Sequence, residues 1–413
     1  MKKNSLIKKI IIGLSAVGPG LFLIGYNIGT GSVTTMAKSG AQYGMTLFWA
    51  LLLSCIFTYI LMVAYGQVTL VTGHTALYNM KSQFKFGKIL ALYVMAAVIL
   101  GEVLALMGIM GIVADLLQEG IRLLFSGLVV NPFWIILVLV IGLYTLLWFG
   151  RYQHFEKVLT FFVILMGLSF IIVFFMVKPS FSAIIKGLVP GVPNTPGAFG
   201  LVAAMAGTTC SAAVFIIRST VVAEKGWTIK NLKTEKKDAF VSAFMMLFLS
   251  GIIMAVAAGT LHLDGKSLEE TVEMIGLFEP LGGKVAAFIL ILGITGAGMS
   301  TVFPIVLIAP WLVSDYTGKP RDIHSPMYRI LTFIGILFGF GMLFLKQRPP
   351  ALMVFSQAFQ ACILPAVAIP IFVLINRKNL MTDNIAGSKM NIGLIAVILF
   401  SFLTTFFALK ELF

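Results

Sequence analysis

The sequence GYNIGTGSVTT, Gly25 to Thr35, lies inside the first apolar stretch of the chain, at residues 12–36. It contains three glycines, one asparagine and several hydroxyl groups, an unusual composition for the middle of a helix that crosses lipid. Backbone N–H and C=O groups outside a regular helix are tolerated at membrane depth only where protein or a water-filled cavity satisfies them. We therefore expect a break in this helix, which Gly29 and Gly31 permit, beside a polar cavity.

The composition indicates an integral membrane protein. Of 413 residues, 59% are apolar and only 11% are charged, too few to coat a soluble globule. A helix crosses the hydrocarbon core with about 20 apolar residues. Eleven such stretches predict an all-α membrane protein, with spans at 12–36, 44–66, 89–114, 131–149, 156–177, 197–222, 239–261, 283–314, 327–345, 350–375 and 391–409.

The net charge of +14 does not indicate a nucleic-acid partner, because the basic residues are scattered through short loops between the spans. Most of the 30 Lys and Arg residues fall on one side if the N-terminus is cytoplasmic. Positive charge in short loops marks the cytoplasmic side. We expect a multi-pass protein of the plasma membrane, with the N-terminus inside and the C-terminus outside. No nucleophile and base set, metal cluster or phosphate loop is evident, so we expect neither an enzyme nor a cofactor.

A second polar interruption, AGTTCSAA at Ala206–Ala213, lies in the sixth predicted span. Interrupted spans at corresponding places in two halves are typical of inverted-repeat transporters with a site near the middle of the membrane. The alternative is that the small residues only allow close helix packing. The matched positions favour the breaks and predict a first repeat at 1–178, a second at 179–380, and an eleventh helix with the C-terminus at 381–413.

Four segments of the chain match those of a known family: GPGLFLIG (18–25), SGAQYGMTLFWALLLS (39–54), LVTGHTAL (70–77) and FSQAFQACILPAVAIPIFVLINRKNLM (355–381). Together they resemble the natural resistance-associated macrophage protein (NRAMP) family of metal-ion transporters. The resemblance implies a LeuT-like fold of five plus five helices and an eleventh, with helices 1 and 6 broken. It also implies proton-coupled uptake of divalent transition metals such as manganese and iron.

The resemblance places the metal-binding motifs of the family on different residue types here. Its Asp-Pro-Gly-Asn motif falls on Gly29–Ser32, its span-six methionine on Ser211, and the alanine whose carbonyl helps coordinate the ion on Thr208. Thioether ligands select transition metals, whereas Mg²⁺ takes oxygen ligands. We therefore expect a cation substrate with a preference shifted from manganese and iron, magnesium among the candidates.

Other family positions are kept in part. The acidic pair of span three becomes Ile99 and Glu102, the second histidine of span six becomes Arg218, and a glutamine that approaches the ion matches Gln357. Glu102 is the one acidic residue that we find deep in a predicted span, and such residues mark ion paths or proton relays. The alternative role for Glu102 is a buried salt bridge with Arg218.

A second function is also compatible with the sequence. Ser300 and Thr301 in span eight lie where LeuT-like symporters place sodium-binding hydroxyls, while Tyr26, Asn27 and Gln357 could hold a small organic solute. A Na⁺- or H⁺-coupled symporter of such a solute is therefore the alternative. The predicted residues are, for substrate, Gly29, Thr30, Ser32, Thr208, Ser211 and Gln357; for proton or cation relay, Glu102 and Arg218; and for sodium, Ser300 and Thr301.

Overall fold

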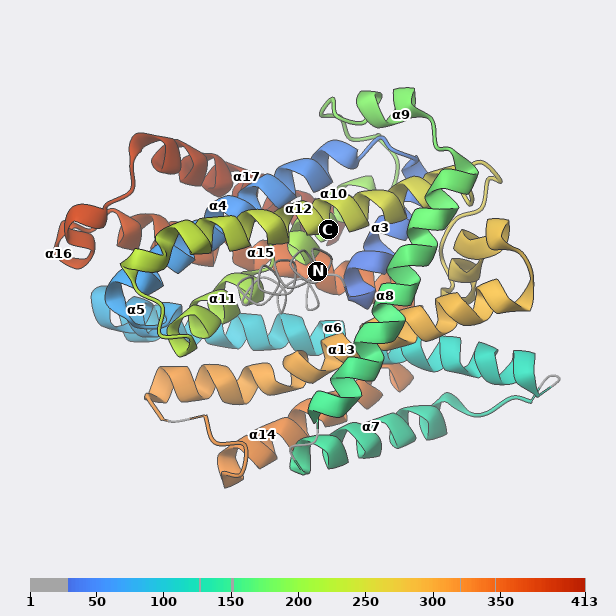
Figure 1. The fold of residues 1–413 in the computed structure, drawn as a ribbon, viewed down its shortest axis with the longest axis horizontal. Coiled ribbons are helices and arrows are strands. Elements are labelled where there is room, and N and C mark those ends of the chain that lie inside the picture. The colour runs from blue at the N-terminus through green and yellow to red at the C-terminus, as the bar shows by residue number, and fades with distance from the viewer. Residues whose placement is uncertain (1–28, 126–127, 150–151, 320, 346, 413) are drawn as a thin grey trace, which may run out of the picture.

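The computed structural model describes residues 29–125, 128–149, 152–319, 321–345 and 347–412, and within these ranges all regular structure is helical (Figure 1). The α-helices are α3 (Thr30–Tyr43), α4 (Phe48–Thr72), α5 (Ala76–Gln83), α6 (Gly87–Leu124), α7 (Pro132–Trp148), α8 (Tyr152–Val177), α9 (Phe181–Lys186), α10 (Ala198–Thr209), α11 (Ala212–Glu224), α12 (Leu232–Gly259), α13 (Gly283–Thr317), α14 (Pro326–Leu337), α15 (Pro349–Ile375), α16 (Lys378–Met381) and α17 (Ser388–Leu412). The 3-10 helices are η1 (Ile229–Asn231), η2 (Thr271–Leu281), η3 (Phe338–Leu343) and η4 (Thr382–Asn384).

Most of the predicted spans appear as helices. In the described ranges, 9 helical segments are long and apolar enough to cross a membrane, and the shorter α7 covers the predicted span 131–149. The first predicted span is described only from Gly29 onward, so Tyr26 and Asn27 lie outside the described residues. The division into two repeats at 178 and 380 remains a prediction.

The predicted break in the sixth span is present. Helix α10 ends at Thr209 and α11 begins at Ala212. Cys210 leaves helical geometry at φ −109°, ψ 42°, and Ser211 is extended at φ −65°, ψ 135°. The Ser211 hydroxyl accepts a hydrogen bond from the Ala213 N–H. Ser211 therefore acts as the N-cap residue of the second half-helix.

The two half-helices lie at the centre of the bundle (Figure 1), and every residue of the most apolar window in their span is buried. Helix α10 packs closely on α15: a Cβ atom on Gly207 would lie 1.7 Å from the carbonyl oxygen of Gln357, so only glycine fits there. Helix α3 packs against α12, and α8 crosses both α12 and α13. The break in the sixth span is therefore enclosed by protein, as buried backbone polar groups require.

The outer surface is apolar over long stretches of helix. On α12, Phe240, Phe244 and Phe248 are exposed, and successive ring centroids lie 6.3 Å apart in a stacked row. Monomeric soluble proteins rarely expose large apolar patches. The row suits contact with lipid chains, in agreement with a multi-pass membrane protein.

Candidate functional site

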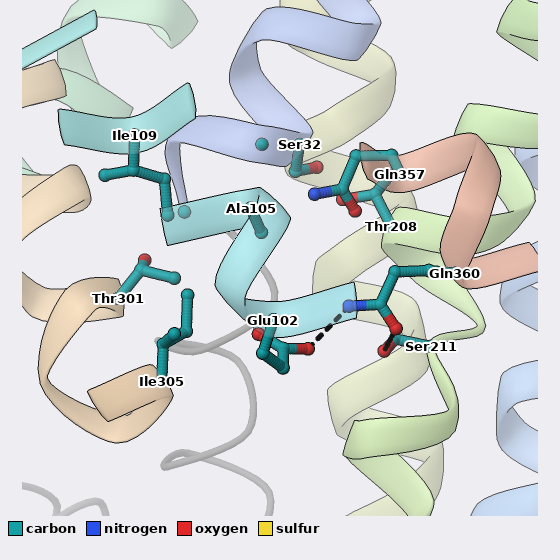
Figure 2. Close-up of a pocket in the computed structure, with 12 residues that line it drawn as sticks. Ser32, Glu102, Ala105, Ile109, Thr208, Ser211, Thr301, Ile305, Gln357 and Gln360 are labelled. Atoms are coloured by element: carbon teal, nitrogen blue, oxygen red, sulfur yellow. Dashed lines mark hydrogen bonds between the residues drawn. The ribbon is translucent and has the colours of Figure 1, made fainter. Parts of the chain in front are cut away.

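A small cavity lies where α3 begins and where α10 gives way to α11 (Figure 2). Its volume is about 30 Å³, which corresponds to roughly two water molecules. The described residues that line it come from five helices and the break between α10 and α11: Gly29, Gly31, Ser32, Glu102, Ala105, Ile109, Thr208, Ser211, Thr301, Ile305, Gln357 and Gln360.

Helix α3 brings its first turn to the cavity. Gly29 is its N-cap residue, in extended conformation and without a side-chain cap. A Cβ atom on Gly29 would lie 2.1 Å from the Thr301 hydroxyl oxygen, so glycine is required for this close approach to α13. Within the first turn, the Ser32 hydroxyl lies 3.1 Å from the Ser250 hydroxyl of α12.

The break between α10 and α11 is satisfied by side chains from neighbouring helices. The last carbonyl groups of a helix have no partner within it. One of them, on Thr209, accepts a 2.9 Å hydrogen bond from the Thr58 hydroxyl of α4. The preceding residue, Thr208, lines the cavity, so the break presents one hydroxyl-bearing residue from each side, Thr208 and Ser211.

A chain of hydrogen bonds joins the break to the acidic residue. The Ser211 hydroxyl donates to the Gln360 carbonyl oxygen at 3.1 Å, and the Gln360 amide nitrogen donates to Glu102 at 2.6 Å (Figure 2). All three side chains are buried. Among the described lining residues Glu102 is the one with an acidic side chain, so its carboxyl group is the source of negative charge at this cavity.

The structure gathers most of the predicted site residues around this cavity. Three of them do not line it: Arg218, described below, and two residues whose hydroxyls point elsewhere. The Thr30 hydroxyl is 3.5 Å from the Ile294 carbonyl oxygen, and the Ser300 hydroxyl donates to the Ala297 carbonyl oxygen at 2.9 Å. Neither lines the cavity. The predicted residues that do line it are Gly29, Ser32, Glu102, Thr208, Ser211, Thr301 and Gln357.

Arg218 does not form the ion pair that we considered for Glu102. Its guanidinium lies 2.8 Å from Glu235 and 2.6 Å from Asp238, both at the start of α12, and all three side chains are buried. Arg218 follows Ser211 by two helical turns, roughly 10 Å along α11. Arg218 therefore connects α11 to α12 through these ion pairs. It lies too far along α11 to take part in the cavity wall with Ser211.

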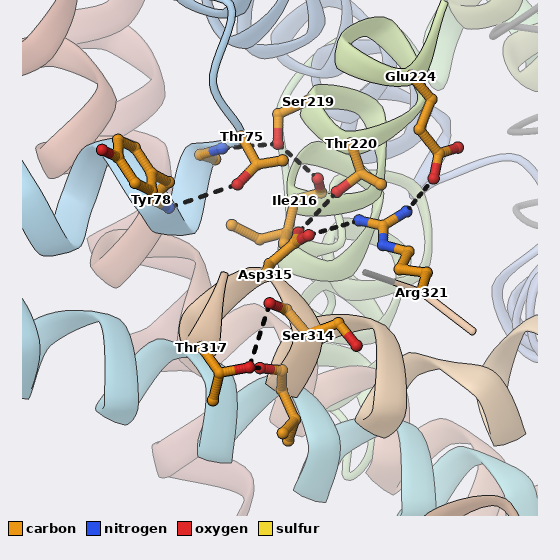
Figure 3. A network of polar contacts seen from close by, with 12 residues as sticks. Thr75, Tyr78, Ile216, Ser219, Thr220, Glu224, Ser314, Asp315, Thr317 and Arg321 are labelled. Atoms are coloured by element: carbon orange, nitrogen blue, oxygen red, sulfur yellow. Dashed lines mark hydrogen bonds and ion pairs between the residues drawn. The ribbon is translucent and has the colours of Figure 1, made fainter. Parts of the chain in front are cut away.

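The far end of α11 is also held by polar contacts (Figure 3). Arg321 pairs with Glu224 at 2.6 Å and with Asp315 of α13 at 2.7 Å, and the Thr220 hydroxyl donates to Asp315 at 3.0 Å. The Ser219 hydroxyl accepts the N–H of Ala76 at the start of α5. Helix α11 is thus fixed at both ends, by its cap at the cavity and by this network.

Two residues near the cavity were not predicted from the sequence. Gln360 lies three residues after Gln357 on α15, a spacing that places both side chains on one face of a helix. That spacing could have identified Gln360. Ser250, the partner of Ser32, carries no such signal, because it is one small residue inside an apolar span.

Sulfur atoms lie behind the cavity rather than on its wall. The Met353 sulfur is 3.5 Å from the Gln357 amide nitrogen, and Cys210 is buried at the break, but neither residue lines the cavity. Among residues 29–412, apart from the few positions not described, no group of three or more His, Cys, Asp or Glu side chains could hold a metal. The polar side chains on the wall are hydroxyls, amides and one carboxylate.

The chain matches the model of one protein family over residues 20–409: "Natural resistance-associated macrophage protein-like". Among curated proteins, it is 23% identical to the divalent metal cation transporter MntH of Pectobacterium carotovorum over 395 residues, covering 94% of this chain and 92% of that protein. It is also 23% identical to MntH of Yersinia enterocolitica over 389 residues, 92% and 91% of the two chains.

Solved structures share the fold. A mutant of the Eremococcus coleocola manganese transporter superposes with a TM-score of 0.73 at 14% identity, covering 96% of this chain and 86% of that chain. Mhp1, a nucleobase-cation-symport-1 family transporter, gives a TM-score of 0.63 at 15% identity, covering 96% and 92%. These likenesses establish the LeuT-like fold.

Proposed function

The chain belongs to the natural resistance-associated macrophage protein-like family, and from this premise we propose that it is a secondary-active membrane transporter of a divalent metal cation and not an enzyme. The relatives named as divalent metal cation transporters match more than nine-tenths of its length. The cavity at the helix breaks is the proposed binding site. Its position agrees with the general placement of ion sites at discontinuous helices.

The observation that carries the proposal is the chemistry of the cavity wall. The hydroxyl-bearing residues Ser32, Thr208, Ser211 and Thr301 line it together with Glu102. Hard cations take oxygen ligands, and Mg²⁺ commonly uses one or two carboxylates and keeps several waters. A cavity of about 30 Å³, with room for roughly two waters, suits an ion that retains part of its hydration.

The proposed substrate preference follows from the same wall. By the resemblance, Ser211 stands where the family has its metal-binding methionine, and thioether ligands favour transition metals over hard cations. A hydroxyl at that position favours a hard cation. We propose that the protein prefers ions such as Mg²⁺ over Mn²⁺ and Fe²⁺, with a proton as the coupling ion and Glu102 as its relay. The proposed setting is the plasma membrane, with the N-terminus inside and the C-terminus outside.

Uptake into proteoliposomes tests the proposal. Purified protein is reconstituted with magnesium- and manganese-sensitive dyes in parallel, with and without an inward proton gradient. We expect saturable uptake of Mg²⁺ with the lower KM, accelerated by the gradient. Uptake of Mn²⁺ with the lower KM would contradict the shifted preference. No uptake of either ion from folded protein would contradict metal transport.

The alternative, a symporter of a small organic solute, is supported by the fold likeness to Mhp1. The described cavity does not favour it, because about 30 Å³ is too small for an organic molecule. If neither metal is transported, binding of organic solutes to the reconstituted protein becomes the next measurement. Replacement of Na⁺ by choline in the same vesicles then distinguishes sodium coupling from proton coupling.

A further inference from the structure

Gln360 lines the cavity and forms hydrogen bonds to two other residues of its wall. It lies on α15, is 2% exposed, and joins Ser211 at the helix break to Glu102 on α6. A Cβ atom on Gly101 would lie 3.2 Å from the Gln360 amide carbon, so the small residue beside Glu102 leaves space for the amide. The amide is therefore held in one place between two polar partners.

The order of donors and acceptors in this chain is set by the carboxylate. An ionised carboxylate only accepts hydrogen bonds. While Glu102 is ionised, the Gln360 amide therefore turns its nitrogen toward Glu102 and its carbonyl oxygen toward Ser211 (Figure 2). The carbonyl oxygen in turn only accepts, so the single hydroxyl proton of Ser211 points to Gln360.

This arrangement decides what Ser211 offers to the cavity. A serine hydroxyl has one proton and two lone pairs. The proton goes to Gln360, and one lone pair accepts the Ala213 N–H at 3.3 Å. One lone pair is left for a ligand, and the hydroxyl has no second proton to donate. Without Gln360 the hydroxyl could turn its proton into the cavity and repel a cation.

We propose that Gln360 is a positioning residue that makes Ser211 an oxygen ligand for a hard divalent cation. The inference rests on the proposed function, because it assigns a role at the same site. Gln360 would act on affinity through Ser211. Gln67 of α4 donates its amide N–H to the Asn384 carbonyl oxygen, does not line the cavity, and provides a matched control.

A double-mutant cycle tests this role, with the KM for Mg²⁺ and kcat measured in proteoliposomes. We expect Ser211→Ala to raise the KM about tenfold in the otherwise unchanged protein, but less than about threefold when Gln360→Met is present. In the control cycle with Gln67→Met, Ser211→Ala should keep its full effect. Ser211→Thr, which retains the hydroxyl, should keep the KM within about twofold.

The outcomes separate this inference from the proposed function. If Ser211→Ala raises the KM by the same factor with and without Gln360→Met, Gln360 does not act through Ser211 and the inference is wrong, while metal transport stands. If the unchanged protein transports no divalent cation, both are wrong. Should Gln360→Met fail to fold, as judged by size-exclusion chromatography and thermal unfolding, Gln360→Leu replaces it in the cycle.

Discussion

Gly207 of α10 packs directly against the backbone carbonyl of Gln357 of α15, so closely that a Cβ atom would lie 1.7 Å from the carbonyl oxygen. This contact is made by backbone, which cannot rotate away as a flexible side chain can. It sets the distance between the half-helix that carries Thr208 and the helix that carries both cavity glutamines. The shape of the site therefore depends on the absence of a side chain at residue 207.

We predict that Gly207→Ala destabilises the protein by about 3 kcal/mol or more, the upper range for overpacking, because α10 and α15 must separate. Gly142→Ala on α7 is the matched control. A Cβ atom there would meet nothing within 4 Å, so we expect a change within about 1 kcal/mol. Thermal unfolding of both variants in detergent makes the comparison. Equal stability of the two would show that the helices can part without cost.

The central helix break could be predicted from the sequence because it depends on local composition. Small and hydroxyl-bearing residues at 206–213 provide Ser211 as the N-cap of a new helix, which is a local preference. The selection of Glu102 and Gln357 as site residues followed from the family resemblance, and that of Thr301 from its place in LeuT-like symporters. Both predictions rest on short segments of sequence, either on their composition or on their similarity to family motifs.

The partners of the charged and amide side chains could not be predicted in the same way. Glu102 was expected deep in span three and Arg218 near the cytoplasmic half of span six, and the sequence contained no measure of their separation. The structure pairs Arg218 with Glu235 and Asp238, which precede the predicted span 239–261. Such pairings depend on the rotation of each helix about its own axis. Successive side chains differ in direction by about 100° around a helix, so a shift of one residue changes which neighbour a side chain faces.

Arg218 allows a prediction about stability. Removing one partner of a buried ion pair is strongly destabilising, because the remaining charge stays buried. Arg218→Met leaves the carboxylates of Glu235 and Asp238 without their guanidinium. We expect it to destabilise the protein by about 3–5 kcal/mol. Arg122→Met is the control, since the Arg122 side chain is 58% exposed in its pair with Glu119. Its loss should cost less than about 1 kcal/mol.

The measurement for both arginine variants is the yield of monodisperse protein and its thermal unfolding. A loss of transport without a loss of stability in Arg218→Met would contradict the structural role. That result would instead support the role in a proton or cation relay that the sequence predicted for Arg218.

Glu102 allows a prediction about charge at the site. Glu102→Gln keeps the size of the side chain and can keep a hydrogen bond to Gln360, but removes the negative charge. Two unit charges about 4 Å apart interact by about 4 kcal/mol at an effective dielectric constant of about 20. We therefore expect Mg²⁺ uptake to fall by about tenfold or more while the protein stays folded.

Glu119→Gln on the same helix is the control for Glu102→Gln, because Glu119 does not line the cavity and pairs with Arg122. Its uptake should remain within about twofold of the unchanged protein. The proton gradient separates the two roles of Glu102: residual uptake that no longer responds to the gradient indicates a relay. Unchanged uptake and unchanged gradient dependence in Glu102→Gln would rule out both roles.

The last prediction concerns two neighbouring hydroxyls that the sequence treated alike. Ser300 and Thr301 both donate to the Ala297 carbonyl oxygen, at 2.9 and 2.8 Å, but only Thr301 lines the cavity. Because the Thr301 proton is used in this bond, its lone pairs can face a cation. If Thr301 binds the transported cation, Thr301→Val should raise the KM of that cation about fivefold. If Thr301 binds a coupling Na⁺, the same substitution should remove the sodium dependence of uptake. Ser300→Ala should have neither effect. Uptake in Na⁺ and in choline decides between these effects. An equal effect of the two substitutions would mean that the hydroxyls act by holding α13 rather than by facing the ion, and the cavity wall would lose one of its proposed ligands.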